Sequence, residues 1–191
     1  FILVNKAKPL PGRLINELLP ETSGFVFPKE LSSRKIPSEL CNLLNQDKAS
    51  PFYKTIKRIS DEKKGSDAVI TDTALISMIR NSLNNPLGAL APYRGATSRD
   101  GIDINGMYKV LCTFWQAVKE VFPDAWGKDP RRSRLTHSAG ILAMGVLMDR
   151  IYARLSGVDE DIKSIKKELT KIEPHCHWTS GTWELIGTPW N

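Results

Sequence analysis

Apolar residues recur at helical spacing along most of this chain. Ile162, Ile165 and Leu169, for example, fall on one face of a helix with 3.6 residues per turn. Prolines, glycines and capping residues mark where such segments begin and end. The pattern therefore predicts helices over residues 11–19, 37–46, 71–83, 107–121, 130–155 and 159–172.

The first four residues, Phe1 to Val4, are bulky and apolar, and the run stops sharply at Asn5. Such a run is typical of a short buried strand. Because the downstream spacing is mostly helical, we expect its partner strand to lie upstream of this segment. The predicted fold is mainly α, with one N-terminal edge strand.

Irregular structure is expected between the helices, at residues 21–33, 60–67 and 91–106. The last of these loops is long and rich in glycine and proline, and loops of that length are often functional. With 191 residues, 41% of them hydrophobic, the chain can bury roughly 70% of its unfolded surface. We predict one domain over residues 1–191: residues 1–20 form a strand–turn–helix, 130–172 the central and final helices, and 173–191 a Trp-rich tail.

Two features bear on the compartment. The longest apolar run, from Ala139 to Met148, is half the length of roughly 20 residues that a membrane helix needs. Cys41, Cys112 and Cys176 are odd in number and show no paired spacing. We therefore expect a cytoplasmic protein with no membrane partner.

The charged residues favour a phosphate-bearing partner. The net charge is +6 and the pI about 9.3, and the positive charge is most concentrated at Arg131, Arg132 and Arg134. With Asp129 as cap and Pro130 at the first helical position, these arginines would occupy the positive end of a helix dipole, which favours a bound phosphate. The alternative is that nearby acids, such as Asp129, neutralise them on a solvated surface.

Small residues interrupt the same predicted helix. Gly140 and Gly145 each cost about 1 kcal/mol relative to alanine inside a helix, so we expect close packing against another helix at both positions. The spacing distributes apolar side chains around this helix, which predicts that it runs through the centre of the domain.

The remaining candidate sites give weaker signals. A solvated face is the preferred interpretation of a second basic group, Lys54, Lys57 and Arg58. The long loop contains Arg94 and Arg99 but no nucleotide-binding motif. The triplet His175–Cys176–His177 has no second pair at zinc spacing, so no metal site is predicted. His137 follows the arginines, without an assigned acidic partner, and is interpreted as a polar helix residue.

Three stretches together resemble the DGQHR-domain family, which includes the DndB proteins associated with DNA phosphorothioation: "FILVNKAKPLPGRLINELLP", "AWGKDPRRSRLTHSAGILAMGVLMDRIYARL" and "HWTSGTWE". The chain begins after the position of the Asp-Gly-Gln-His-Arg signature, and Ala7 stands where the family segment has threonine. The resemblance implies a helical C-terminal part of an α/β protein related to the ParB and sulfiredoxin superfamily. By that analogy Asn5, Lys6 and Lys8 would lie near a phosphate pocket.

The resemblance implies a DNA-binding or regulatory component of a bacterial or archaeal DNA-modification or phage-defence system. DNA is the expected partner, along with other modification or defence proteins, and a homo-oligomer is compatible with this interpretation. One alternative is a nucleotide-hydrolysing or DNA-nicking enzyme whose active site, and any bound nucleotide, lie mainly upstream; this segment alone is not expected to be an enzyme or to hold a cofactor. Another is an interaction scaffold that uses Trp178, Trp183 and Trp190.

Overall fold

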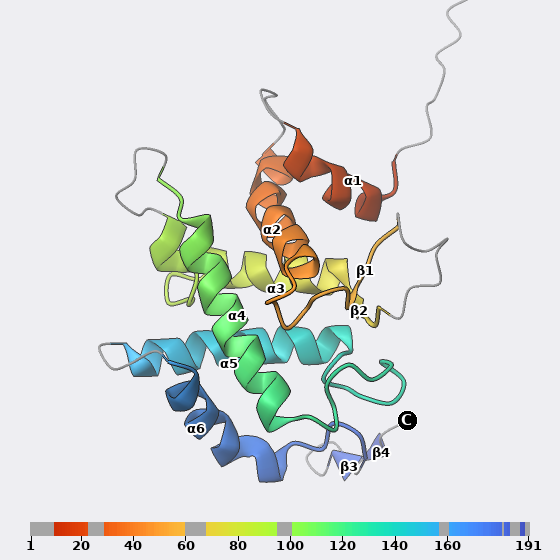
Figure 1. Ribbon diagram of the computed structural model, residues 1–191, viewed down its shortest axis with the longest axis vertical. Coiled ribbons are helices and arrows are strands. Elements are labelled where there is room, and N and C mark those ends of the chain that lie inside the picture. Colours follow the sequence, from red (N-terminus) through yellow and green to blue (C-terminus); the bar gives the residue numbers. More distant parts are fainter. Residues whose placement is uncertain are drawn as a thin grey trace, which may run out of the picture.

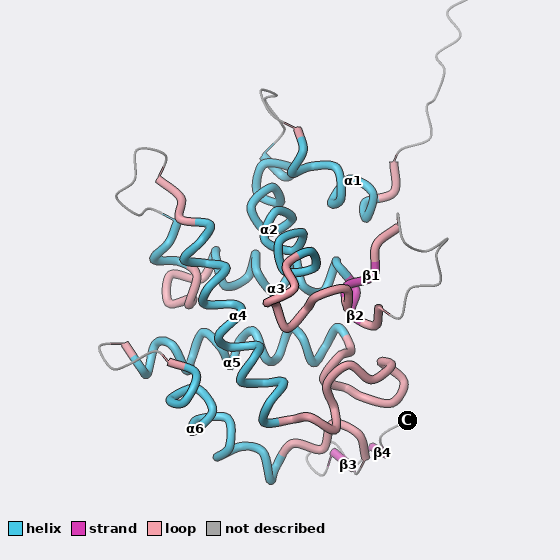
Figure 2. Tube along the Cα trace, viewed as in Figure 1, coloured by secondary structure: helices cyan, strands magenta, loops and turns pink. Residues whose placement is uncertain are grey.

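The computed structural model describes residues 10–22, 29–59, 68–94, 101–156 and 161–180, with the backbone alone for 29–33, 182–183 and 188–189. The described part is mainly helical, as predicted (Figures 1 and 2). Its α-helices are α1 (Gly12–Leu18), α2 (Lys29–Gln46), α3 (Asp72–Asn84), α4 (Ile104–Val121), α5 (Ser138–Leu155) and α6 (Ile162–Ile172). Three 3-10 turns follow helices or loops, η1 (Leu19–Glu21), η3 (Ala91–Arg94) and η4 (Glu173–His175).

Two small sheets accompany the helices. Strands β1 (Ile56–Lys57) and β2 (Ile70–Thr71) pair in parallel, and β3 (Thr182–Trp183) pairs antiparallel with β4 (Thr188–Pro189). The sequence pattern predicted neither pair, because two-residue strands are too short to show an alternating pattern. The predicted edge strand at Phe1 to Val4 lies outside the described residues.

Helix α3 packs along α5, while α4 packs on α6 and α2 contacts both α3 and α4 (Figure 1). An aromatic cluster joins the turn before β1 to α4, with the Phe52 ring 5.1 Å from Trp115 and 5.4 Å from Trp126. Tyr152 of α5 donates a hydrogen bond of 3.3 Å to the Val110 carbonyl of α4. The helices therefore share one hydrophobic core.

Several helices begin away from the predicted residue. Helix α2 begins at Lys29 and continues through Pro37, so the prediction of irregular structure up to residue 33 was wrong. Helix α4 begins at Ile104, inside the predicted loop, because Asp103 caps it by accepting a 2.8 Å hydrogen bond from the Gly106 N–H. Helix α6 is capped in the same way by Asp161.

Helix α5 differs most from its prediction. It begins at Ser138 rather than Pro130, and His137 is its N-cap, with Nδ1 accepting from the Ala139 N–H at 3.2 Å. One face of the helix is open to solvent, since Val146 is 53% exposed. None of the helices described is long and apolar enough to cross a membrane.

Candidate functional site

The segment from Lys128 to Arg134, here called the basic loop, precedes α5 and is not helical. The Asp129 carbonyl accepts hydrogen bonds from the N–H groups of Arg132 at 2.7 Å and Ser133 at 3.0 Å. The Asp129 carboxylate accepts from the Arg131 N–H at 2.9 Å. The predicted position of the arginines at a helix N-terminus was therefore wrong, because Asp129 closes a turn on itself instead of capping a helix.

Contacts on both sides hold the basic loop in place. The Thr136 hydroxyl donates to the Lys128 carbonyl at 2.7 Å, and Ser133 and Thr136 are both buried. The Arg134 N–H donates to the Trp178 carbonyl at 2.8 Å, so the C-terminal segment supports the loop from outside. These anchors fix the backbone that carries the exposed side chains of Arg131 and Arg132.

The cations of the basic loop differ in their exposure. The Arg131 side chain is 93% exposed and lies 3.5 Å from the Asp129 carboxylate. Lys128 and Arg132 are also exposed, whereas Arg134 is half-buried. Lys128, Asp129 and Arg132 line a hollow of about 430 Å³ together with Thr179. Since an exposed ion pair contributes only about 0–1 kcal/mol, Asp129 leaves most of the positive charge available to an external anion.

The first tryptophan of the Trp-rich segment, Trp178, packs against the hydrophobic core. Trp178 packs edge-on against Phe122, with ring centroids 5.9 Å apart, and its indole N–H is buried without a hydrogen-bond partner among the described residues. The side chains of Trp183 and Trp190 lie outside the described residues. Around His175 and His177, as elsewhere in the described part of the chain, no three His, Cys, Asp or Glu side chains are grouped to hold a metal.

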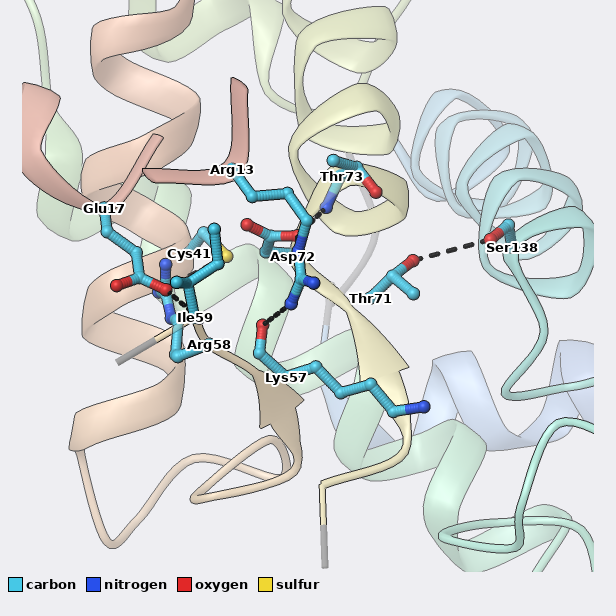
Figure 3. A network of polar contacts seen from close by, with 10 residues as sticks. All are labelled: Arg13, Glu17, Cys41, Lys57, Arg58, Ile59, Thr71, Asp72, Thr73 and Ser138. Carbon is cyan, nitrogen blue, oxygen red and sulfur yellow. Dashed lines mark hydrogen bonds and ion pairs between the residues drawn. The ribbon is translucent and has the colours of Figure 1, made fainter. Parts of the chain in front are cut away.

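A second polar region lies where α1, α2, β1 and the start of α3 meet, and it was not predicted. It consists of Arg13, Glu17, Cys41, Arg58 and Asp72, here called the buried polar network (Figure 3). Arg13 of α1 lies 3.2 Å from the Asp72 carboxylate, which is completely buried at the start of α3. Arg13 also donates to the Lys57 carbonyl of β1 at 3.3 Å. The network therefore joins α1 to the parallel sheet and α3.

Arg58 is the most buried cation of the network, with 6% of the residue exposed. Its Nη2 donates to the Cys41 sulfur at 3.6 Å, while Nη1 has no hydrogen-bond partner among the described residues. The interpretation of Arg58 as part of a solvated face was therefore wrong. It fails because Arg58 stands two positions after the buried Ile56, so an extended backbone places both side chains on the inner face.

Burial shifts the protonation of two members of the network. Desolvation raises the pKa of Asp72, although the hydrogen bond from the Thr73 N–H and the nearby Arg13 oppose the shift. Desolvation also raises the pKa of Cys41 to about 12, with Arg58 acting in the opposite direction. Cys41 is consequently a neutral thiol at physiological pH and is not an activated nucleophile.

The structure brings only part of the predicted site together. Arg131, Arg132 and Arg134 share the basic loop, whereas Asn5, Lys6 and Lys8 lie outside the described residues. One contact links the start of α5 to the sheet that borders the buried polar network: the Thr71 and Ser138 hydroxyls lie 3.4 Å apart (Figure 3). Sequence reasoning missed the network because Arg13 and Asp72 are 59 positions apart, and no local pattern connects them.

Comparisons with protein-family models, with curated proteins and with solved structures give no match. The resemblance to the DGQHR-domain family and to the ParB and sulfiredoxin superfamily therefore stays a prediction.

Proposed function

We propose that this chain is a DNA-binding component of a DNA-modification or phage-defence system and that it contacts the phosphate backbone through the basic loop. The observation that carries the proposal is the set of exposed cations on a fixed turn: Lys128, Arg131 and Arg132 with one acid, Asp129, among them. The net charge of +6 and the family resemblance point in the same direction.

The basic loop suits phosphate better than it suits bases. Guanidinium groups donate paired hydrogen bonds to phosphate oxygens, and a loop fixed by Thr136 and Trp178 loses little conformational freedom on binding. The arginines lie on a loop and not on a helix that could enter a groove. We therefore expect binding with little sequence preference and strong dependence on salt.

The direct test replaces the three exposed cations together, as Lys128→Gln, Arg131→Gln and Arg132→Gln. Arg134 is left intact because its side chain is half-buried and therefore less available to a phosphate than the three exposed cations. Binding of a duplex oligonucleotide is measured by fluorescence anisotropy between about 50 and 200 mM salt. The slope of log K against log salt should become shallower by about 0.9 for each phosphate that the variant no longer neutralises.

A matched control removes the same charge elsewhere, by Arg150→Gln, Lys163→Gln and Lys167→Gln, three exposed cations of α5 and α6. The control should keep the parent's slope if the basic loop is the binding surface. Equal slopes for the loop variant and the parent, with both folded by circular dichroism, would reject the proposal. Equal reductions of slope in both triple variants would also reject it, because they would show a diffuse charge effect instead.

The resemblance extends the proposal to Asn5, Lys6 and Lys8, which it places near a phosphate pocket. Their contribution is separable from that of the basic loop, since Lys6→Gln and Lys8→Gln can be combined with the loop variant. Additive reductions of slope would indicate that both regions neutralise phosphates, and no change on replacing Lys6 and Lys8 would remove them from the proposed site.

A further inference from the structure

A second cavity shares no residue with the basic loop. It has a volume of about 530 Å³ and lies between α1 with η1, the last turns of α2 and the turn before β1. Its size falls within the range of about 300–1,000 Å³ typical of small-molecule sites. Arg58 of the buried polar network forms part of its lining.

The charges that line this cavity balance. Glu17 and Glu21 contribute two carboxylates, and Lys54 and Arg58 contribute two cations. A phosphate or carboxylate ligand would meet both glutamates, and a cationic ligand would meet Lys54 and Arg58. Because the lining carries both signs of charge, it disfavours a ligand with a single net charge.

Side-chain amides supply matched donors and acceptors beside these charges. Asn42, Asn45 and Gln46 line the cavity from the last turns of α2. The Asn45 side-chain oxygen accepts from the Ile56 N–H at 3.1 Å, which fixes that side chain and turns its NH₂ toward other partners. The side chains of Asn42 and Gln46 form no hydrogen bond with the residues that the structure describes, so both amides are available to a ligand.

The far wall of the cavity combines an aromatic ring with a strained backbone. Tyr53 and Lys54 both line it, with the Lys54 Nζ 5.2 Å from the centre of the Tyr53 ring. Lys54 has φ +56°, a left-handed conformation that lysine rarely adopts, held by its N–H donating to the Asn45 carbonyl at 3.1 Å. Such conformations concentrate at ligand sites.

We infer that this cavity binds a nucleobase, held by the amides of α2 and the Tyr53 side of the pocket. Nucleobases are uncharged, present donors and acceptors along one edge, and are read by asparagine and glutamine amides in pairs of hydrogen bonds. The inference rests on the proposed DNA-binding function, because a base displaced from the bound DNA would be the source of such a ligand.

The test uses the four deoxyribonucleosides as probes, with sucrose and free glutamine as uncharged and zwitterionic comparisons. Binding is followed by the side-chain amide signals of Asn42 and Gln46 in ¹H–¹⁵N NMR and by calorimetry. At least one nucleoside should shift those signals and bind more tightly than the two comparison compounds. Asn42→Ala with Gln46→Ala should weaken that nucleoside about tenfold or more, as expected when a paired hydrogen bond is removed.

Asn81→Ala, at an exposed asparagine of α3, is the matched control and should leave nucleoside affinity unchanged. Salt-dependent duplex binding is measured on the same samples. Nucleosides that fail to bind a protein that still binds duplex DNA would overturn the nucleobase inference alone. Nucleoside binding that is unchanged by the double replacement would show that nucleosides bind outside this cavity. Tighter binding of sucrose or glutamine would overturn the ligand class, and absence of duplex binding in the parent would overturn the proposed function separately.

Discussion

Gly145 of α5 lies directly against Met78 of α3: a Cβ at position 145 would stand 2.2 Å from the Met78 Cγ. Real side chains do not approach so closely, so the two helices pack at a distance that only glycine permits. This contact confirms the prediction from sequence that Gly145 marks close helix packing. It also explains why a residue that costs about 1 kcal/mol inside a helix stands at this position.

Replacing Gly145 should therefore overpack the junction of α3 and α5. Gly145→Ala forces the Met78 side chain into another rotamer, and Gly145→Leu also pushes the helices apart. We expect Gly145→Leu to lower the free energy of unfolding by about 1–3 kcal/mol, with a smaller decrease for alanine. Urea denaturation followed by circular dichroism measures both changes.

The matched control for this prediction is Gly12→Ala in α1. A Cβ at Gly12 meets no atom within 4 Å, so alanine there should be neutral or slightly stabilising. An unchanged midpoint for Gly145→Leu, beside an unchanged Gly12→Ala, would mean that α3 and α5 do not pack as described.

The helices that could be predicted are those whose apolar spacing matches their burial. Residues 71–83 and 107–121 correspond closely to α3 and α4, because each buries one continuous apolar stripe. The start of α5 was misplaced because Asp129 followed by Pro130 has the residue types of a helix start, and local residue types do not distinguish a cap from a turn closed by Asp129 itself. His137 is an uncommon cap and gave no comparable signal.

The buried polar network could not be predicted, for a different reason. Its pairs join residues far apart in sequence, such as Arg13 with Asp72 and Arg58 with Cys41. Whether a charged residue is buried depends on the packing of the whole chain, and charge alone favours exposure. The three arginines of the basic loop were found because they are close in sequence and therefore visible as a cluster, whereas Lys128 was not named among them.

Gly140 offers a test of whether the basic loop must be held in place. A Cβ at this position would lie 2.0 Å from the Arg134 carbonyl oxygen. Its nearest neighbours belong to the segment before α5, so the prediction of packing against another helix was wrong for Gly140. A backbone atom cannot move aside by changing rotamer. Gly140→Ala should displace the loop from the start of α5. We expect the free energy of unfolding to fall by about 1–3 kcal/mol, together with weaker duplex binding at low salt.

Measuring both the stability and the duplex binding of Gly140→Ala distinguishes two outcomes. Lower stability with unchanged binding and salt slope would show that loop placement does not matter for phosphate binding. Gly145→Ala is the comparison, because it disturbs α5 away from the basic loop and should leave the salt slope as in the parent.

Asp149 holds the connection after α3 in place. Its carboxylate accepts hydrogen bonds from the Ser82 hydroxyl at 2.5 Å and from the Ala89 N–H at 2.9 Å, and it is 7% exposed. Asp149→Ala would leave both donors buried without this acceptor, at a cost of about 3 kcal/mol in total. Asp149→Asn keeps an acceptor oxygen and should cost about 1 kcal/mol. Equal decreases for the two variants in urea denaturation would contradict this role of the carboxylate oxygen.

The raised pKa of Asp72 predicts how the free energy of unfolding depends on pH. Desolvation at the start of α3 disfavours the ionised carboxylate, so the folded chain binds this proton more tightly than the unfolded chain, whose aspartate has the ordinary pKa of 3.8. The contribution of Asp72 to the free energy of unfolding is therefore greatest below pH 3.8. It decreases as the pH rises through the raised pKa, and is constant above it.

Asp72→Asn isolates this effect, because its side-chain oxygen still accepts from the Thr73 N–H and from Arg13 but does not titrate. Urea denaturation of both proteins at a series of pH values gives the free energy of unfolding of the parent minus that of the variant. Exposed carboxylates with lowered pKa values, such as Glu120 and Asp161, reduce stability toward acid in both proteins, and their effects cancel in the difference. The difference should fall as the pH rises from 3.8. A difference that rises instead would mean that Arg13 and the Thr73 N–H outweigh the desolvation of the Asp72 carboxylate.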